Sequence, residues 1–141
     1  MKKVNLVAVY GSLRKSMSNN LILMNSKFIG TFHSEPEYTM YNINNMFPGV
    51  TKEGYTSIVM EIYEIDKAVE EKLNRLEGYS ENNENSDNFY DRIIINTPYG
   101  NAYLYIFNDD TTHFEKVESG DWVKEKKQTK SMVSNLYESW D

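Results

Sequence analysis

The first apolar segment of the chain, residues 4–10 (VNLVAVY), is an almost continuous hydrophobic run that stops at Gly11. A run with apolar side chains on both faces predicts a buried strand, and the glycine predicts a tight turn after it. In residues 18–29, three apolar side chains recur at helical spacing: Leu21, Met24 and Phe28. Ser18 is a suitable N-cap, so this spacing favours a short helix after the turn.

Strand character returns in residues 56–65 (TSIVMEIYEI), after a turn signal at residues 47–49 (FPG). Because successive side chains of a strand point to opposite faces, Glu61 shares a face with Val59 and Tyr63. A carboxylate embedded among apolar strand residues is a candidate for a structural ion pair.

Residues 66–76 carry the signals of a helix. Asp66 is a suitable N-cap, and Gly78 stands where a glycine commonly ends a helix. The buried stripe of this helix is expected to comprise Val69, Leu73 and Leu76. Glu77 falls at the C-terminal end, where the helix dipole presents negative charge. A carboxylate there is harder to ionise than usual, unless a cation or hydrogen bonds offset the effect.

The second half of the chain predicts a loop, a hairpin and a last helix. Residues 80–88 (SENNENSDN) have no apolar anchor, which is typical of a flexible loop. Residues 89–96 and 101–107 predict paired strands around a turn at residues 98–100. One side of the predicted last helix is apolar, with Met132, Val133, Leu136 and Trp140. This order predicts an α+β fold, a small mixed β-barrel or sheet flanked by helices, in one domain spanning residues 1–141.

Composition and charge narrow the classes of function. The 21 acidic and 15 basic side chains give a net charge of −6, and an acidic surface repels phosphate backbones, so no nucleic-acid partner is expected. The basic segment Lys124–Lys130 fits a solvated segment before the last helix. There is no cysteine, and hence no thiolate nucleophile or disulfide. The apolar run Leu6–Tyr10 is too short for a signal peptide, and no stretch reaches membrane-spanning length, so a cytoplasmic protein without membrane contact is expected.

Candidate chemistry is confined to a few positions. No nucleotide-binding glycine pattern is present, and two histidines without cysteine disfavour a zinc site, so no cofactor or metal is expected. Four polar residues close in sequence fit a solvated loop better than a metal site: Asp109, Asp110, His113 and Glu115. Ser12 lacks the context of a serine nucleophile. The loop Tyr10–Arg14 instead presents several backbone N–H groups between a strand and a helix, where an anionic oxygen can bind.

Several segments, in order along the chain, resemble the gamma-glutamyl cyclotransferase-like family. Residues 10–14 (YGSLR) match its opening Tyr-Gly-Ser/Thr-Leu-Arg/Lys motif, and Asn19 stands at the place of an asparagine that follows it. Residues 73–79 (LNRLEGY) resemble its Leu-Asp-x-x-Glu-Gly-Tyr segment, and residues 90–92 resemble its Tyr-x-Arg strand. Further matches are FPGV at 47–50, AYLYIF at 102–107 and ESGDW at 118–122. The chain departs from the pattern at Asn74, where the family usually has aspartate, and in a longer loop at residues 80–88.

The resemblance implies a reaction and a site. Members of the family release 5-oxoproline from a small-molecule gamma-glutamyl substrate, by attack of its own alpha-amine on the gamma-carbonyl. Glu77 occupies the place of the catalytic glutamate, which acts as general acid and base. The resemblance assigns substrate binding to Tyr10, Gly11, Ser12, Leu13, Asn19, Tyr90, Arg92 and Tyr105.

The sequence leaves alternative roles open for several residues and for the protein as a whole. Arg92 shares a strand face with Tyr90 and could grip a carboxylate, but a structural pairing with an acid such as Glu61 is favoured. For Glu77, the alternative to catalysis is an exposed acid at a helix end. The whole protein could instead be an enzyme that removes protecting gamma-glutamyl groups from a metabolite, a non-catalytic binder of a small carboxylate or amine, or an acidic interaction module. The loop 80–88 is interpreted as a tolerated surface insertion, with a lid as the alternative.

Overall fold

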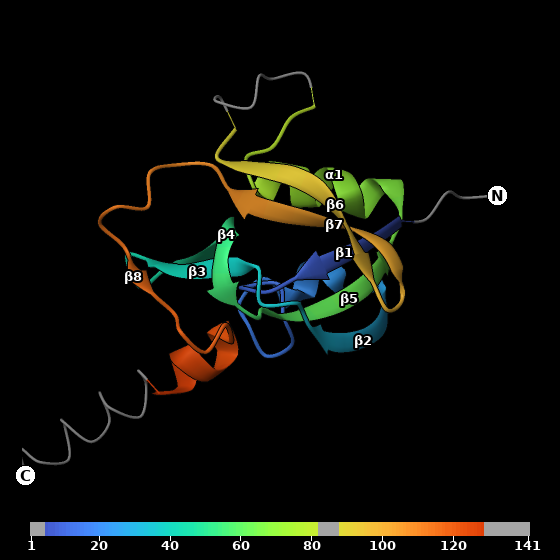
Figure 1. The fold of residues 1–141 in the computed structure, drawn as a ribbon. Helices are drawn as coiled ribbons and strands as arrows, with labels where there is room; N and C mark the ends of the chain where they lie inside the picture. The colour runs from blue at the N-terminus through green and yellow to red at the C-terminus, as the bar shows by residue number, and fades with distance from the viewer. Residues whose placement is uncertain (1–4, 82–87, 129–141) are drawn as a thin grey trace, which may run out of the picture.

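A five-stranded mixed sheet forms the centre of the molecule (Figure 1). The computed structural model describes residues 5–81 and 88–128. The strand order is β2-β5-β1-β7-β6, and β1 pairs in parallel with β7 but antiparallel with β5. These strands are β1 (Asn5–Val9), β2 (Lys27–His33), β5 (Val59–Ile65), β6 (Tyr90–Thr97) and β7 (Gly100–Phe107). The apolar run at the start of the chain is therefore a central strand, as its sequence predicts.

A smaller sheet packs beside the first one. It has the order β4-β3-β8 and comprises β3 (Tyr38–Ile43), β4 (Phe47–Thr56) and β8 (Glu115–Lys116). The two sheets meet where β4 crosses β7: a side chain at Gly49 would lie 2.8 Å from the Phe107 ring. The helical residues of the described part of the chain are η1 (Asn20–Leu23), α1 (Lys67–Leu76) and residues 122–128. The α+β prediction is confirmed, and within the described residues the strands form two sheets rather than a closed barrel.

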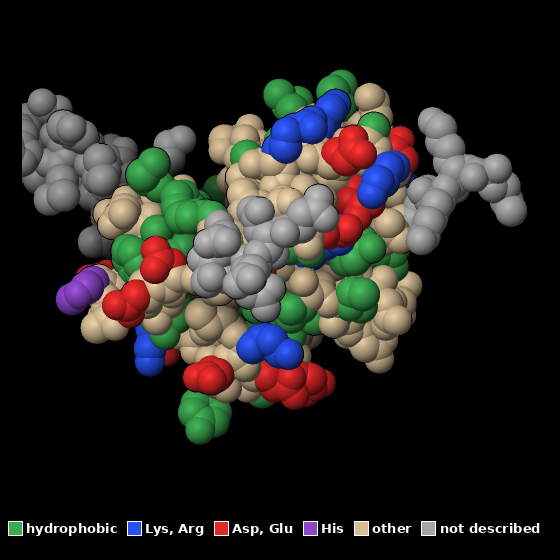
Figure 2. All heavy atoms as spheres, turned by 90° about the horizontal axis from the view of Figure 1, so that it is seen from above, with side chains coloured by type: hydrophobic (Ala, Val, Ile, Leu, Met, Phe, Trp, Pro, Cys, Tyr) green, Lys and Arg blue, Asp and Glu red, His purple; other side chains and the backbone are tan. Residues whose placement is uncertain are grey.

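Two hydrophobic cores lie on opposite faces of β1. Val7 and Val9 pack into one core with Leu73 of α1, which covers that face of the sheet. Ala8 points to the other core, which contains Trp122 of the C-terminal helix and residues of the smaller sheet. Alternation of side chains along a strand explains this division. Acidic and basic side chains are interspersed on the face of the molecule seen in Figure 2.

The helix expected over residues 18–29 is the main error of the sequence-based prediction. Only Asn20–Leu23 are helical, as a single 3-10 turn, and Lys27–His33 form a strand that pairs with β5. Asn19 takes the N-cap position expected for Ser18, without a side-chain cap. The three residues of the predicted apolar stripe, Leu21, Met24 and Phe28, are exposed. Pairing with the edge of β5 overrides the local spacing, because strand formation depends on tertiary context.

Two smaller details also differ from prediction. Residues 47–49 lie within β4, and the turn precedes them at Asn44 and Asn45, which have φ of 55° and 62°. Asparagine tolerates this left-handed region better than most residues. On α1, Leu73 is buried as expected, but Leu76 is exposed and Glu70 is buried instead.

Other predicted elements are confirmed. The side chain of Asp66 accepts a hydrogen bond from the N–H of Val69 at 3.0 Å, as an N-cap should. Strands β6 and β7 pair around a turn that follows Thr97.

The predicted last helix with Met132 and the middle of the 80–88 loop lie outside the described residues. Within the described part of the chain, no helix has the length and apolar character needed to cross a membrane.

Candidate active site

A cavity of about 230 Å³ opens where β1, β4 and α1 end or begin. We call it the Glu77 cavity. Its walls contain every predicted site residue except Arg92: Tyr10, Gly11, Ser12, Leu13, Asn19, Glu77, Tyr90 and Tyr105. These residues come from four segments of the sequence, and the fold brings them around one space. Sequence matching alone could not show that they share a cavity.

The end of α1 places Glu77 in the cavity wall. Glu77 is the last residue with helical backbone, and Gly78 adopts φ of +64°, which turns the chain away from the helix. The backbone N–H of Phe89 then bonds to the carbonyl of Gly78 at 3.1 Å, and that of Tyr90 bonds to the carbonyl of Glu77 at 3.1 Å. The start of β6 thus fixes the position of the glutamate.

Burial gives Glu77 unusual acid–base properties. Removal of water from around its carboxyl raises the pKa to about 7. Among the described residues, no side chain or backbone group donates a hydrogen bond to this carboxyl, and no cation pairs with it. The residue is only partly covered and borders the cavity. Glu77 can therefore exchange protons with a molecule in the cavity near neutral pH.

Three tyrosines surround Glu77 with their hydroxyl groups directed to other acceptors. Tyr10 donates to the carbonyl of Tyr105 at 2.7 Å, and Tyr90 donates to the carbonyl of Pro48 at 2.7 Å. Tyr105 donates to the side chain of Asn74 at 2.5 Å. Burial, together with the nearby charge of Glu77, raises the pKa of the Tyr90 and Tyr10 hydroxyls. These tyrosines stay protonated and shape the walls.

The raised pKa of Glu77 predicts a pH-dependent cost to stability. A folded-state pKa above the unfolded value means that the folded protein binds the proton more tightly, so stability falls as pH rises through this range. Glu77→Gln mimics the protonated form. It should match the wild type at pH 4 and exceed its free energy of unfolding by about 2–3 kcal/mol at pH 8.

Urea unfolding of both proteins at the two pH values measures this difference. Glu71→Gln, an exposed position on the same helix, is the matched control and should stay within about 0.5 kcal/mol of the wild type. Equal stability of wild type and Glu77→Gln at pH 8 would show that the folded protein does not favour the protonated carboxyl.

The loop of residues 10–14 forms another part of the cavity wall and is held tightly. A side chain at Gly11 would meet the ring of Pro48 at 2.7 Å, so only glycine permits this approach. The backbone N–H of Asn19 bonds to the carbonyl of Ser12 at 2.8 Å, and the Asn19 side chain donates to the Ser12 hydroxyl at 2.8 Å. The backbone N–H groups of Ser12 and Leu13 make no hydrogen bond within the described part of the chain. They are available to an anionic oxygen in the cavity.

Arg14 fastens this loop to the rest of the protein through buried charges. Its guanidinium pairs with Glu61 at 2.8 Å and with Asp121 at 2.8 Å. The second oxygen of Glu61 accepts hydrogen bonds from the Tyr63 hydroxyl at 3.0 Å and the N–H of Lys15 at 2.9 Å. Glu61 is a structural acid, as its strand position suggests, but its partner is Arg14, and the suggested pairing with Arg92 is wrong.

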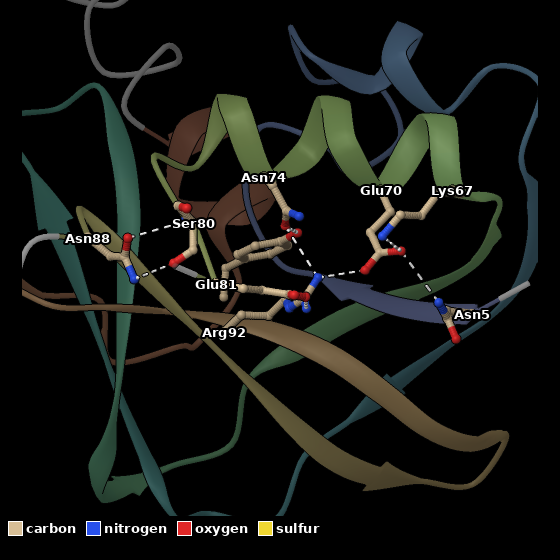
Figure 3. Close-up of polar contacts among 9 residues, drawn as sticks. Asn5, Lys67, Glu70, Asn74, Ser80, Glu81, Asn88 and Arg92 are labelled. Carbon is tan, nitrogen blue, oxygen red and sulfur yellow. Dashed lines mark hydrogen bonds and ion pairs between the residues drawn. The ribbon is translucent and has the colours of Figure 1, made fainter. Parts of the chain in front are cut away.

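Arg92 lies behind the cavity wall, between β6 and α1 (Figure 3). It pairs with the buried Glu70 at 2.7 Å and with Glu81 at 2.6 Å, and its guanidinium lies 4.0 Å from the ring centre of Tyr103. It also donates to the Asn74 oxygen that accepts the Tyr105 hydroxyl. The structure therefore places Arg92 in a structural network one residue removed from the cavity.

Other residues of the wall were not predicted as site residues. The cavity is also bordered by Ser18, Met46, Phe47, Pro48, Leu76 and Phe89. Phe47 and Pro48 belong to a segment that matches the family pattern, which is a signal for them. Met46 and Phe89 carry no such signal, because apolar residues beside a strand are ordinarily interpreted as core.

No group of three or more His, Asp or Glu side chains that could hold a metal ion occurs among the described residues.

Comparison with known proteins identifies the family. The model of the gamma-glutamyl cyclotransferase, AIG2-like family matches residues 7–124 of the chain. The protein belongs to this family. A Vibrio cholerae protein named as a candidate gamma-glutamylcyclotransferase is 35% identical over 120 residues, covering 85% of this chain and 96% of its own. The gamma-glutamylcyclotransferase family protein YtfP of Escherichia coli K12 is 32% identical, covering 86% and 98%.

Solved structures agree with this assignment. An uncharacterized protein of Pyrococcus horikoshii has a TM-score of 0.73 with 26% identity, covering 90% of this chain and 97% of its own. The solution structure of ytfP from Escherichia coli has a TM-score of 0.66 with 30% identity, covering 86% and 98%. The gamma-glutamyl cyclotransferase-like fold expected from the sequence is thus confirmed, and membership supports an enzyme of this kind acting on a small gamma-glutamyl molecule.

Proposed function

We propose that this protein is a cyclotransferase that releases 5-oxoproline from gamma-glutamyl amides, with Glu77 as the general acid and base. The observation that carries the proposal is the Glu77 carboxyl in the cavity wall, with a pKa of about 7 and no protein partner among the described residues. A group poised between its two protonation states is suited to take up a proton and return it.

The reaction needs one proton carrier and no water. Glu77 takes a proton from the alpha-ammonium group of the substrate, and the freed amine attacks the gamma-carbonyl carbon. A C–N bond forms, and the carbonyl oxygen becomes an oxyanion. When this tetrahedral intermediate collapses, the bond to the leaving amine breaks, and the protonated Glu77 gives its proton to that amine. The new ring nitrogen passes its surplus proton to the regenerated Glu77 carboxylate, which delivers it to the released amine. The products are 5-oxoproline and the amine as its ammonium ion. Because the nucleophile is part of the substrate, positioning supplies much of the rate increase.

The loop of residues 10–14 supplies anion binding. The free N–H groups of Ser12 and Leu13 are suited to an anionic oxygen, either the oxyanion or the substrate's alpha-carboxylate. Asn19 holds Ser12 in place through two hydrogen bonds. The walls formed by Tyr10, Tyr90 and Tyr105 limit the space available, which favours the folded-back conformation needed for ring closure.

The decisive experiment follows product formation in water enriched in ¹⁸O. The protein is incubated with gamma-glutamyl alkylamides, gamma-glutamyl dipeptides, gamma-glutamyl-epsilon-lysine and glutathione, and the products are analysed by mass spectrometry. Intramolecular attack predicts 5-oxoproline without ¹⁸O. Glutamate that carries one ¹⁸O would identify a hydrolase. Tight binding of these compounds by calorimetry, without any product, would identify a non-catalytic binding protein.

A further inference from the structure

The mouth of the Glu77 cavity is formed by large apolar side chains that remain exposed. Met46, Leu76 and Phe89 all border the cavity, and they are 71%, 42% and 46% exposed. Single exposed apolar residues are ordinary on protein surfaces, but several around one opening indicate a surface that a ligand covers. We call these three residues the apolar rim.

Phe89 of the apolar rim is held in place by neighbouring rings, and the backbone of Met46 is held by a turn. The Phe89 ring packs edge-on against Tyr90, Phe47 and Phe107, with ring centres 5.3, 5.8 and 5.6 Å apart. Met46 closes the turn between β3 and β4, where its N–H bonds to the carbonyl of Ile43 at 3.0 Å. A preformed apolar surface binds an apolar group without the cost of ordering it first.

Among the described residues, the same opening offers no cation to a negative charge. Of the described residues that border the cavity, none is Lys, Arg or His, and Glu77 is the only one with a carboxyl. The two arginines behind the walls are paired, Arg14 with Glu61 and Arg92 with Glu70. Lys126 donates to the carbonyl of Asn45 and lies over the ring of Trp122, which is not part of the cavity wall. A carboxylate placed at the mouth would lose water and lie near Glu77 without a compensating cation.

The size of the cavity decides which part of a substrate meets the rim. At about 230 Å³ it is smaller than most ligand sites, which hold about 300–1,000 Å³. A glutamyl group that reaches Glu77 and the N–H groups of Ser12 and Leu13 occupies the interior, so the leaving amine projects through the mouth. Resting on the proposed function, we infer that the substrates are gamma-glutamyl amides of alkyl or arylalkyl amines without a carboxylate, and that amides of amino acids or peptides with a free carboxylate are disfavoured.

A matched substrate pair tests this inference. Gamma-glutamylphenethylamine and gamma-glutamylphenylalanine differ only by the carboxylate. We expect kcat/KM to be at least about tenfold higher for gamma-glutamylphenethylamine. An equal or higher value for gamma-glutamylphenylalanine would overturn the inference and leave the cyclotransferase reaction standing.

A charge introduced into the rim should change this preference. Met46→Lys is expected to shift the ratio of kcat/KM toward gamma-glutamylphenylalanine by about two- to fivefold, the contribution of one exposed ion pair. Met24→Lys is the matched control, because Met24 is 72% exposed and lies outside the cavity; its ratio should equal that of the wild type. An unchanged ratio in Met46→Lys would remove the rim from substrate selection.

Binding separates this inference from the reaction itself. Calorimetry with Glu77→Gln, which is expected to bind without turnover, should give a lower Kd for gamma-glutamylphenethylamine than for gamma-glutamylphenylalanine. If no compound yields 5-oxoproline but this order of Kd values holds, the proposed reaction fails and the rim preference stands. The reverse order of Kd values contradicts the preference, whatever the turnover.

Discussion

Glu77→Gln is expected to lower kcat/KM for 5-oxoproline release by about 10²–10⁴-fold, the usual contribution of a general acid–base group. Glutamine has the shape of the protonated acid but cannot accept the proton of the alpha-ammonium group. The carbonyl and N–H of residue 77, which hold the end of α1 and the start of β6, are unchanged by the substitution. Activity should therefore be lost without loss of the fold, as circular dichroism and steady-state release of 5-oxoproline can measure.

The pH dependence of the wild type provides a second test of the same residue. Since the reaction begins with an ionised carboxylate, kcat/KM should rise with pH and level off above the Glu77 pKa of about 7. The residual kcat/KM of Glu77→Gln should not show this rise with pH. Glu71→Gln, an exposed control on the same helix, should retain both the wild-type kcat/KM and its rise with pH. Full activity in Glu77→Gln would exclude the proposed role, and Glu61 would not replace it, because both of its oxygens are bound to Arg14, Tyr63 and Lys15.

The elements predicted correctly are those whose signals are local. The continuous apolar run of β1, the cap of α1 at Asp66 and the glycine after Glu77 each depend on neighbouring residues only. The segment 18–29 failed because its strand exists through pairing with β5, which no local spacing encodes. Strong local signals and tertiary pairing thus account for the success and the failure.

The predicted site residues other than Arg92 border one cavity, but this arrangement could not be predicted from the sequence. Resemblance to the family supplied Glu77 and the loop 10–14, and the fold shows that they border one cavity. Two features depended on contacts between distant segments. One is the ion pairing: Glu61 pairs with Arg14 rather than with Arg92, and Arg92 pairs with Glu70 behind the cavity wall. The other is the apolar rim, because an exposed Met46 cannot be distinguished from a core residue by its hydrophobicity.

The buried pair of Arg14 and Glu61 is expected to give the largest effect on stability. Both side chains are almost completely covered, and Arg14 joins the loop 10–14 to β5 and to Asp121 before the C-terminal helix. Arg14→Met leaves the Glu61 carboxylate buried without its cation. The expected loss is about 3–5 kcal/mol of the free energy of unfolding, measured by urea denaturation.

The double variant Arg14→Met/Glu61→Leu distinguishes a stranded charge from lost packing. With both charges removed, the penalty for the unpaired carboxylate disappears, so the double variant should be more stable than Arg14→Met alone. Arg75→Met, the same substitution at an exposed position of α1, should cost no more than about 1 kcal/mol. If the double variant were as unstable as the sum of the two single variants, the two side chains would act independently and the pair would not anchor the loop. If the double variant regains stability but its KM for a gamma-glutamyl substrate is higher than that of the wild type, the charge of Arg14 is required to position the loop 10–14 for substrate binding.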